Sequence, residues 1–275
     1  MSVVLSMGRS VVAALAFLAL GQTICPANAA EQVGNAKHVV NTVTDAGPVG
    51  RRNLAAEDPV YRNDAISAAA ASHGELLLHD GSHVIVGENS TVSLDNFVIS
   101  GSSFSAGTVK VTKGAFRFIS GNSGKEAISI RTPLASIGVR GTVVDVYVEP
   151  HTGVTRTILI SGRITACSSP GRCLTVHRSC DIIEVGRNGQ VRQLPFLHSS
   201  RWSQADEARL FGLTVNQQNF SSQWRAFEGG CYARAAEEIR SDRSKRNEPS
   251  PPPDVVPPPV VVTPTPPPGD CEICL

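Results

Sequence analysis

The sequence predicts a mainly β fold: an all-β sandwich or roll of short strands, then a small helical region and a disordered Pro-rich tail. Apolar residues alternate with polar ones through the body of the chain, which is typical of half-buried strands. Turn signals separate these runs at the 8–12-residue spacing of short strands. Eleven of the 18 prolines lie between Pro249 and Pro268. A β-solenoid is the alternative architecture, although no fixed repeat period is visible.

Length and charge limit the class of protein. The 275 residues allow one or two domains with tails. The formal net charge is +1, and loss of residues 1–29 removes only Arg9, which leaves 0. Binding to nucleic acid or to anionic lipid through overall charge is therefore not expected.

The N-terminal segment, residues 1–29, is typical of a cleavable signal peptide. Arg9 precedes the apolar stretch Val11–Leu20, which is too short to span a bilayer. Ala27-Asn28-Ala29 supplies the small-x-small cleavage pattern. We expect cleavage after Ala29 and a location in the periplasm or outside the cell. No later stretch reaches 18 apolar residues, so no transmembrane segment is expected in the mature chain.

The strand pattern indicates which side chains face inward. Period-two alternation places one row of side chains inside and the other in water. Tight turns are expected at Asp80-Gly81 and Asn188-Gly189, because these dipeptides tolerate positive φ. The alternating apolar residues are Val84, Val86, Val92, Leu94, Val109, Val111, Phe116, Phe118, Ile128, Ile130, Val144, Val146, Val148, Ile158 and Ile160.

Three ordered motifs carry a family resemblance over about residues 57–165. Leu76–Gly87 contains Asp80-Gly81-Ser82 within an apolar strand pair, and Val109–Phe118 supplies a second hairpin segment. Thr132–Thr142 reads T-P-L-A-S-I-G-V-R-G-T and includes Gly138, Arg140, Gly141 and Thr142. Together these segments resemble the FecR domain, which we place within a β domain at 47–165. Whether the motif residues are structural or bind a ligand stays open.

The resemblance implies an all-β module of the cell envelope. In the best-known members this domain is the periplasmic part of a transmembrane regulator, which senses an outer-membrane iron-siderophore transporter and controls a sigma factor. In this chain only about ten residues precede the apolar segment, too few for a sigma-binding domain. We therefore expect an exported non-enzymatic module that binds or scaffolds an unknown envelope protein or polymer, with a link to sensing or signalling. The alternatives are an envelope-polymer hydrolase and a periplasmic regulator of an iron-uptake sigma-factor pathway.

The segment from Gly138 to Thr142 also has a physical interpretation. Glycine within a strand pattern marks a bulge or a close backbone approach. Arg140 would then reach across the sheet to a carboxylate such as Asp145 or Asp80, and an anion-binding arginine is the alternative.

Six cysteines remain after signal cleavage, which suits an oxidising compartment. Cys167 and Cys173 frame a turn in a Cys-containing β extension at 166–195. By elimination Cys180 would pair with Cys231, although four cysteines allow three connectivities. For the terminal pair, Cys271 and Cys274, we expect a local or intermolecular disulfide.

Residues 199–240 change to a helical period. Ser203 with Asp206 forms a capping box that opens a short helix to about Leu213. A stripe at helical spacing follows, interrupted at Gly229-Gly230, and we expect it to dock on the β body, with a partner-binding face as the alternative. Residues 241–275 form the disordered tail. The stripe consists of Phe220, Trp224, Phe227, Cys231, Ala235 and Ile239.

Catalytic, metal and cofactor motifs were sought, and none is predicted. The chain has no G-x-S-x-G elbow and no H-E-x-x-H pair. His73, His79 and His83 cluster near one hairpin, but His79 and His83 lie on opposite sides of the Asp80-Gly81 turn, an awkward geometry for one metal.

Overall fold

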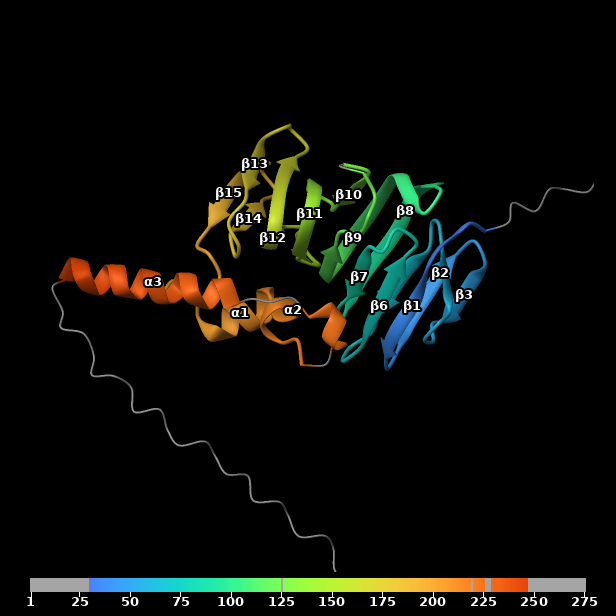
Figure 1. Ribbon diagram of the computed structural model, residues 1–275, viewed down its shortest axis with the longest axis horizontal. Coiled ribbons are helices and arrows are strands. Elements are labelled where there is room, and N and C mark those ends of the chain that lie inside the picture. The colour runs from blue at the N-terminus through green and yellow to red at the C-terminus, as the bar shows by residue number, and fades with distance from the viewer. Residues whose placement is uncertain (1–29, 125, 219, 226–228, 247–275) are drawn as a thin grey trace, which may run out of the picture.

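The computed structural model describes residues 30–124, 126–218, 220–225 and 229–246, and these form a β body with a helical appendix (Figure 1). The mainly β prediction is confirmed, since 15 strands join in one hydrogen-bonded sheet. The predicted signal segment, the Pro-rich tail from 247 onward and the Cys271–Cys274 pair lie outside the described residues. No helix among the described residues is long and apolar enough to cross a membrane.

The strands follow one another across the body, from blue at one end to yellow at the other (Figure 1). The strands are β1 Gln32–Val40, β2 Val43–Gly47, β3 Gly50–Asn53, β4 Pro59–Tyr61, β5 Ala65–Ala68, β6 His73–Leu78, β7 His83–Val86, β8 Ser90–Ser100, β9 Ser103–Ile119, β10 Ile128–Arg131, β11 Ala135–Val148, β12 Thr155–Ser168, β13 Cys173–Val176, β14 Ile182–Val185 and β15 Val191–Leu194. The helices are α1 Gln204–Leu210, α2 Gly212–Val215, the 3₁₀ turn η1 Ser222–Trp224 and α3 Gly229–Arg246.

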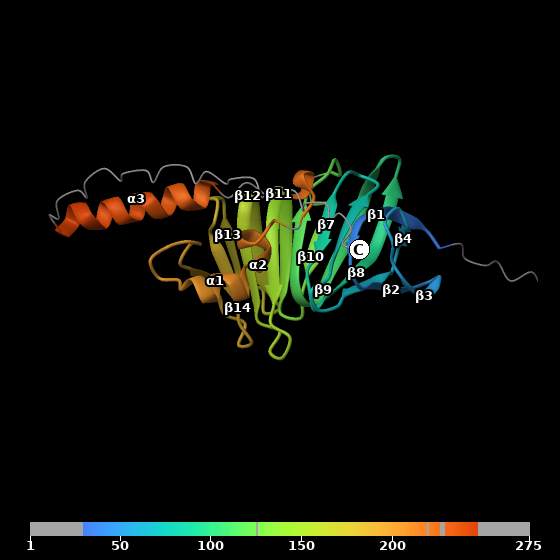
Figure 2. The same ribbon diagram turned by 90° about the horizontal axis from the view of Figure 1, so that it is seen from below.

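Strand pairing divides the body into two layers that share three strands. The first layer runs β3-β2-β5-β8-β9-β10-β11-β12-β13. The second layer runs β4-β1-β6-β7-β9-β11-β12-β14-β15. Every pairing is antiparallel except β9 with β10. The described strands therefore form a sandwich in which strands switch layers, not a solenoid of parallel coils (Figure 2).

Three glycines stand where the shared strands pass from one layer to the other. Gly114 in β9, Gly141 in β11 and Gly162 in β12 have φ values of 84°, 56° and 92°, a region that glycine adopts readily. The register of β11 shifts between Arg140 and Val143, which confirms the bulge predicted in this segment. Such bulges bend a strand and let it continue in a second sheet.

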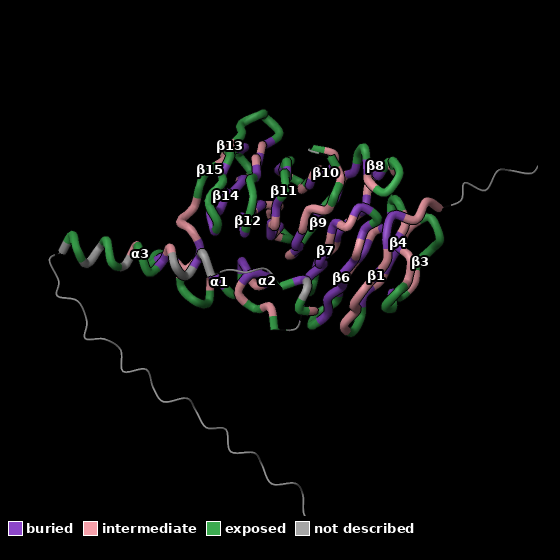
Figure 3. Tube along the Cα trace, viewed as in Figure 1, coloured by how far each residue is buried: buried purple, intermediate pink, exposed green. Residues whose placement is uncertain are grey.

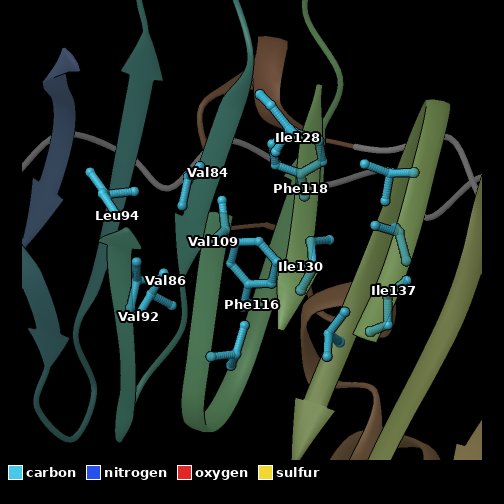
Figure 4. Close-up of a cluster of buried hydrophobic side chains, with 14 of the residues drawn as sticks. Val84, Val86, Val92, Leu94, Val109, Phe116, Phe118, Ile128, Ile130 and Ile137 are labelled. Carbon is cyan, nitrogen blue, oxygen red and sulfur yellow. The ribbon is translucent and has the colours of Figure 1, made fainter. Parts of the chain in front are cut away.

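The main core lies between the two layers. Val109, Ile130 and Ile137 are cross-strand neighbours in the first layer, and Val84 and Phe118 are neighbours in the second. All five are at most 1% exposed and belong to one buried cluster (Figure 4). The predicted inward-facing rows are thus correct except in β12, where Leu159 belongs to this core and the predicted Ile158 and Ile160 belong to a second cluster.

The appendix, residues 196–246, covers the outer face of the second layer and forms further cores there. Ile158 and Ile182 of the sheet pack with Leu210 and Phe211, while Ile85 packs with residues that include Trp224. Strands β7 and β14 are therefore mostly buried on both faces (Figure 3). This explains the consecutive apolar residues Val84–Val86 in β7 and Ile182-Ile183 in β14. It also corrects the expectation that the alternate row would face water.

Several boundaries differ from the sequence-based ones. The first strand begins at Gln32, ahead of the predicted domain at 47–165, and β1 pairs with β6. Ser203 caps α1 by accepting a hydrogen bond from the Asp206 amide, as predicted. The stripe is interrupted at the predicted place, because η1 ends at Trp224 and α3 begins at Gly229. Helix α3 extends to Arg246, inside the segment predicted as tail.

Two cysteine pairs lie at disulfide distance. Cys167 and Cys173 close the β12–β13 turn with a Cα–Cα distance of 4.0 Å. Cys180 and Cys231, with a Cα–Cα distance of 5.5 Å, tie α3 to the segment before β14. Both pairings agree with the sequence-based assignment.

Two buried carboxyl groups face each other near one end of the body. Asp45 and Asp64 are both fully buried. Arg52 forms an ion pair with Asp45 at 3.0 Å and a longer one with Asp58 at 3.9 Å, whereas none with Asp64 is found among the described residues. Burial, together with the neighbouring Asp45, raises the pKa of Asp64 from 3.8 to about 7.

We predict that the glycines at the layer crossings tolerate substitution unequally. Gly141→Val should lower the free energy of unfolding by about 1–3 kcal/mol, because its φ is positive although a Cβ there has open space. Gly162→Val should cost more, because a Cβ would overlap the Gly141 carbonyl. Urea unfolding of both variants measures the difference, and equal costs would contradict the close approach.

We predict that Asp64 makes stability fall with rising pH. Its folded pKa lies above the unfolded value, so the contribution is fully present below about pH 4 and is lost as pH rises through about 7. Asp64→Asn cannot ionise and should remove this decline. Urea unfolding at several pH values between 4 and 8 tests it; parallel curves for wild type and variant would show that Asp64 is not responsible.

Candidate functional site

The Asp80-Gly81-Ser82 segment forms the turn between β6 and β7, with Gly81 at a φ of 79°. The Asp80 carboxylate accepts the Ser82 amide and hydroxyl, each at 2.8 Å. It also accepts the Ser123 hydroxyl at 2.5 Å, and the Gly121 amide donates to the Ser82 hydroxyl. The turn is therefore fastened to the loop at 120–124 that follows β9.

The Arg140–Thr142 segment is fastened to the same loop. The Thr142 amide donates to the Ser120 hydroxyl at 3.0 Å, and the Ser120 amide donates to the Thr142 carbonyl. The Thr142 hydroxyl accepts the Arg140 amide and donates to the Arg163 carbonyl. These bonds hold the bulge at Gly141 in place.

The two motifs meet around one cavity of about 350 Å³, although they are 60 residues apart in sequence. Asp80 and Ser82 line one side, Arg140 and Gly141 another, and the loop at 120–124 lies between them. Arg140 is exposed, and among the described residues its guanidinium has no carboxylate partner. Gly138, by contrast, lies in the regular part of β11 opposite Ser129 and does not line the cavity.

Comparison with known families assigns this part of the chain. Residues 64–165 match the family model described as FecR protein. The chain contains a FecR domain. The matched segment begins just before β5 and ends inside β12, so it includes both motifs of the cavity. Strands β1–β4, which precede the FecR segment, and β13–β15, which follow it, complete the two layers.

The structural neighbours are distant. Two crystal structures of a protein described as a "putative anti-sigma factor" from Parabacteroides distasonis ATCC 8503 share 18% and 17% identity with this chain, with TM-scores of 0.40 and 0.39. Each comparison covers 48% of this chain and 59% of that one, so this chain spans less than two thirds of the protein it resembles. No curated protein matches the sequence.

Asp80 and Asp145, the carboxylates considered from the sequence as partners of Arg140, both have other partners in the structure. Asp80 accepts its hydrogen bonds from Ser82 and Ser123, and Asp145 pairs with Arg117. The Arg140 side chain therefore contacts neither carboxylate, and the alternative of an anion-binding arginine remains.

The buried pair of Arg117 and Asp145 was not predicted. Arg117 is fully buried, and its Nε and Nη2 donate to the two Asp145 oxygens at 2.6 and 2.7 Å. The Thr214 hydroxyl donates to Asp145 Oδ2 at 2.6 Å. The two residues are cross-strand neighbours on β9 and β11, on the outer face of the second layer.

Arg117 also contacts the appendix. Its Nη2 donates to the Leu213 carbonyl at 2.8 Å, and its Nη1 donates to Gln217 Oε1 at 2.6 Å. Nη1 also lies 3.3 Å from the Trp224 carbonyl. One guanidinium thus joins two strands to three positions in the appendix, which is how a buried arginine is satisfied. The sequence signal for this role was one basic and one acidic residue among the apolar rows of two predicted strands that are not consecutive in the chain.

The hairpin histidines do not form one group. His79 is exposed on the turn, while His83 packs against the Trp224 ring with centroids 4.0 Å apart. His73 packs edge-on against the Phe220 ring. Burial lowers the pKa of both His73 and His83, and nearby carboxylates only partly offset it.

We predict that breaking the buried pair is costly. Arg117→Met leaves Asp145 buried without its counter-charge and should lower the free energy of unfolding by about 3–5 kcal/mol. Combining it with Asp145→Leu should recover part of that loss, because no unpaired charge remains. Urea unfolding of the single and double variants tests this; a single variant within about 1 kcal/mol of wild type would contradict it.

Proposed function

We propose that this chain is an exported, non-enzymatic binding module of the cell envelope whose FecR domain holds an acidic segment of a partner protein. The observation that carries the proposal is the convergence of the two motifs on one cavity with Arg140 at its edge. A purely structural role of the two motifs would explain the Asp80 turn and the Gly141 bulge. It would not explain the exposed guanidinium of Arg140, which has no carboxylate partner among the described residues.

The chemistry of the cavity suits a carboxylate on the partner. A planar guanidinium binds a carboxylate through two parallel hydrogen bonds. Hydroxyl-bearing side chains of Ser120 and Ser123 lie in the same lining and supply further polar contacts. A Glu or Asp side chain, or a chain terminus, fits such a site.

The hydrogen bonds of the acidic residues favour a binding function over a hydrolytic one. Asp80 accepts three hydrogen bonds, and Asp145 is held by Arg117 and Thr214. Neither carboxylate is placed to take a proton from a substrate or a water molecule. This argues against the envelope-polymer hydrolase considered from the sequence.

The location and the cellular role belong to the same proposal. The signal-type segment at 1–29 and the paired cysteines support export to the periplasm or beyond. Because the best-known FecR domains act in envelope sensing, we propose that partner binding reports on the envelope. N-terminal sequencing of the exported protein, with Ala30 expected first, tests the export step.

We predict that charge reversal at Arg140 abolishes partner capture. The experiment immobilises wild type, Arg140→Glu and the control Arg131→Glu and incubates each with envelope extract. Arg131 is an exposed arginine of β10 outside the cavity. Quantitative mass spectrometry should show at least one protein retained by wild type and control and reduced about tenfold or more by Arg140→Glu, since like charges now face each other. Unchanged melting temperatures establish that all three are folded.

Equal capture by the two variants would overturn the assignment of the cavity. Equal loss with both variants would indicate general electrostatic attraction to a basic face, which also contradicts a specific site.

A further inference from the structure

A second group of polar side chains lies on the outer face of the second layer, away from the cavity of the FecR motifs. It consists of His38 on β1 with His73 and Glu75 on β6. Their ligand atoms all lie within 4.8 Å of one another. Glu75 is fully buried and His73 is 7% exposed, whereas the His38 side chain is 43% exposed.

The strand register brings these residues together. His73 and Glu75 are two residues apart on β6 and so share a face. His38 is the cross-strand partner of Glu75, and the register of β1 shifts between Ala36 and His38. Ala36, opposite Leu76, faces the main core, and without the shift His38 would share its face. The bulge turns His38 outward to join the other two.

The two separations from Glu75 Oε1 are close to those around one small cation. His38 Nδ1 lies 3.5 Å from Glu75 Oε1, and His73 Nε2 lies 3.7 Å from the same oxygen. Ligands of a tetrahedral Zn²⁺ at 2.0–2.1 Å are about 3.3–3.4 Å from one another. Shifts of a few tenths of an ångström in the side chains would close the remaining difference for these two pairs.

Three buried atoms of the cluster have no hydrogen-bond partner among the residues that the structure describes. These atoms are His38 Nδ1, His73 Nε2 and Glu75 Oε2. The Glu75 carboxylate accepts a hydrogen bond from the Ser221 amide, at 3.0 Å from Oε1. Buried polar atoms are normally satisfied, and a buried carboxylate normally has a counter-charge. A cation between the three side chains would give the buried atoms a partner and the carboxylate a counter-charge.

We propose that His38, His73 and Glu75 bind Zn²⁺. Two imidazoles and one carboxylate are a donor set that zinc prefers, and they leave a fourth position for water or a ligand. His73 also lines a cavity of about 570 Å³ beside the appendix, which offers a path for the ion.

The site is also joined to the appendix. The Ser221 amide binds Glu75, and the Phe220 ring packs against His73 with centroids 5.3 Å apart. Bound Zn²⁺ would fix both side chains and thereby strengthen docking of the segment around Ser221. The orientation of each ligand by a second contact is typical of metal sites.

The test uses the untagged chain, stripped with a chelator and titrated with Zn²⁺ by isothermal calorimetry. Wild type and the control His79→Ala, an exposed histidine of the same hairpin, should each bind one Zn²⁺ per chain. His38→Ala alters a part-exposed side chain, so the fold should persist, and its affinity should fall at least tenfold. Hydrogen exchange should show that Zn²⁺ protects the amides around Ser221 in wild type. In His38→Ala the same protection should be much weaker.

Absence of stoichiometric binding to wild type would overturn the proposal, as would equal affinities of His38→Ala and His79→Ala. Binding without protection around Ser221 would place the ion elsewhere and would likewise contradict it. Partner capture through Arg140 does not involve these residues, so the two proposals fail independently.

Discussion

The buried ion pair between Arg117 and Asp145 is the interaction on which the rest of the structure depends. It lies on the face of the second layer that would otherwise meet water, and it exists there only because the appendix covers it. An isolated buried charge is costly, so the pair, the Thr214 hydroxyl and the carbonyl oxygens of the appendix must be present together. Sheet and appendix are therefore stabilised as one unit, and Cys180–Cys231 adds a covalent link between the same two parts.

One row of cross-strand neighbours connects this pair to the proposed zinc site. Following the register from β1 to β11, the row reads His38, Glu75, Ile85, Arg117 and Asp145. Charged groups stand at both ends of the row and an apolar contact with the appendix lies between them. The appendix is thus held at one end by the Arg117–Asp145 ion pair and at the other by the Ser221 amide on Glu75 and the Phe220 ring on His73.

The cavity of the FecR motifs lies on the side of β9 opposite to the Arg117–Asp145 pair. Arg117 faces the appendix, whereas its neighbour Phe118 faces the interior and lines the cavity. The loop after β9 then binds both the Asp80 turn and the Thr142 bulge. The motif residues Asp80 and Ser82 line the cavity, and Thr142 fastens the loop beside it. Arg140, at the edge of the cavity, is the residue for which we propose a contact with a partner. The side chains of Asp80, Ser82 and Thr142 are thus engaged in hydrogen bonds within the domain, whereas that of Arg140 is exposed.

The sequence by itself determined the β class, most of the inward rows, the Asp80-Gly81 turn, the Ser203 cap and the Cys167–Cys173 pair, because these depend on local backbone preferences and short-range patterns. The Cys180–Cys231 pair, 51 residues apart, followed only by elimination. Only the tertiary structure decided what covers the second layer. Period-two alternation cannot distinguish water from a covering helix, so the alternate rows, which contain Arg117 and Asp145, were expected to face water. Only the register decided that His38 joins His73 and Glu75, because a one-residue bulge moves a side chain to the opposite face of a strand and leaves no mark in the sequence pattern.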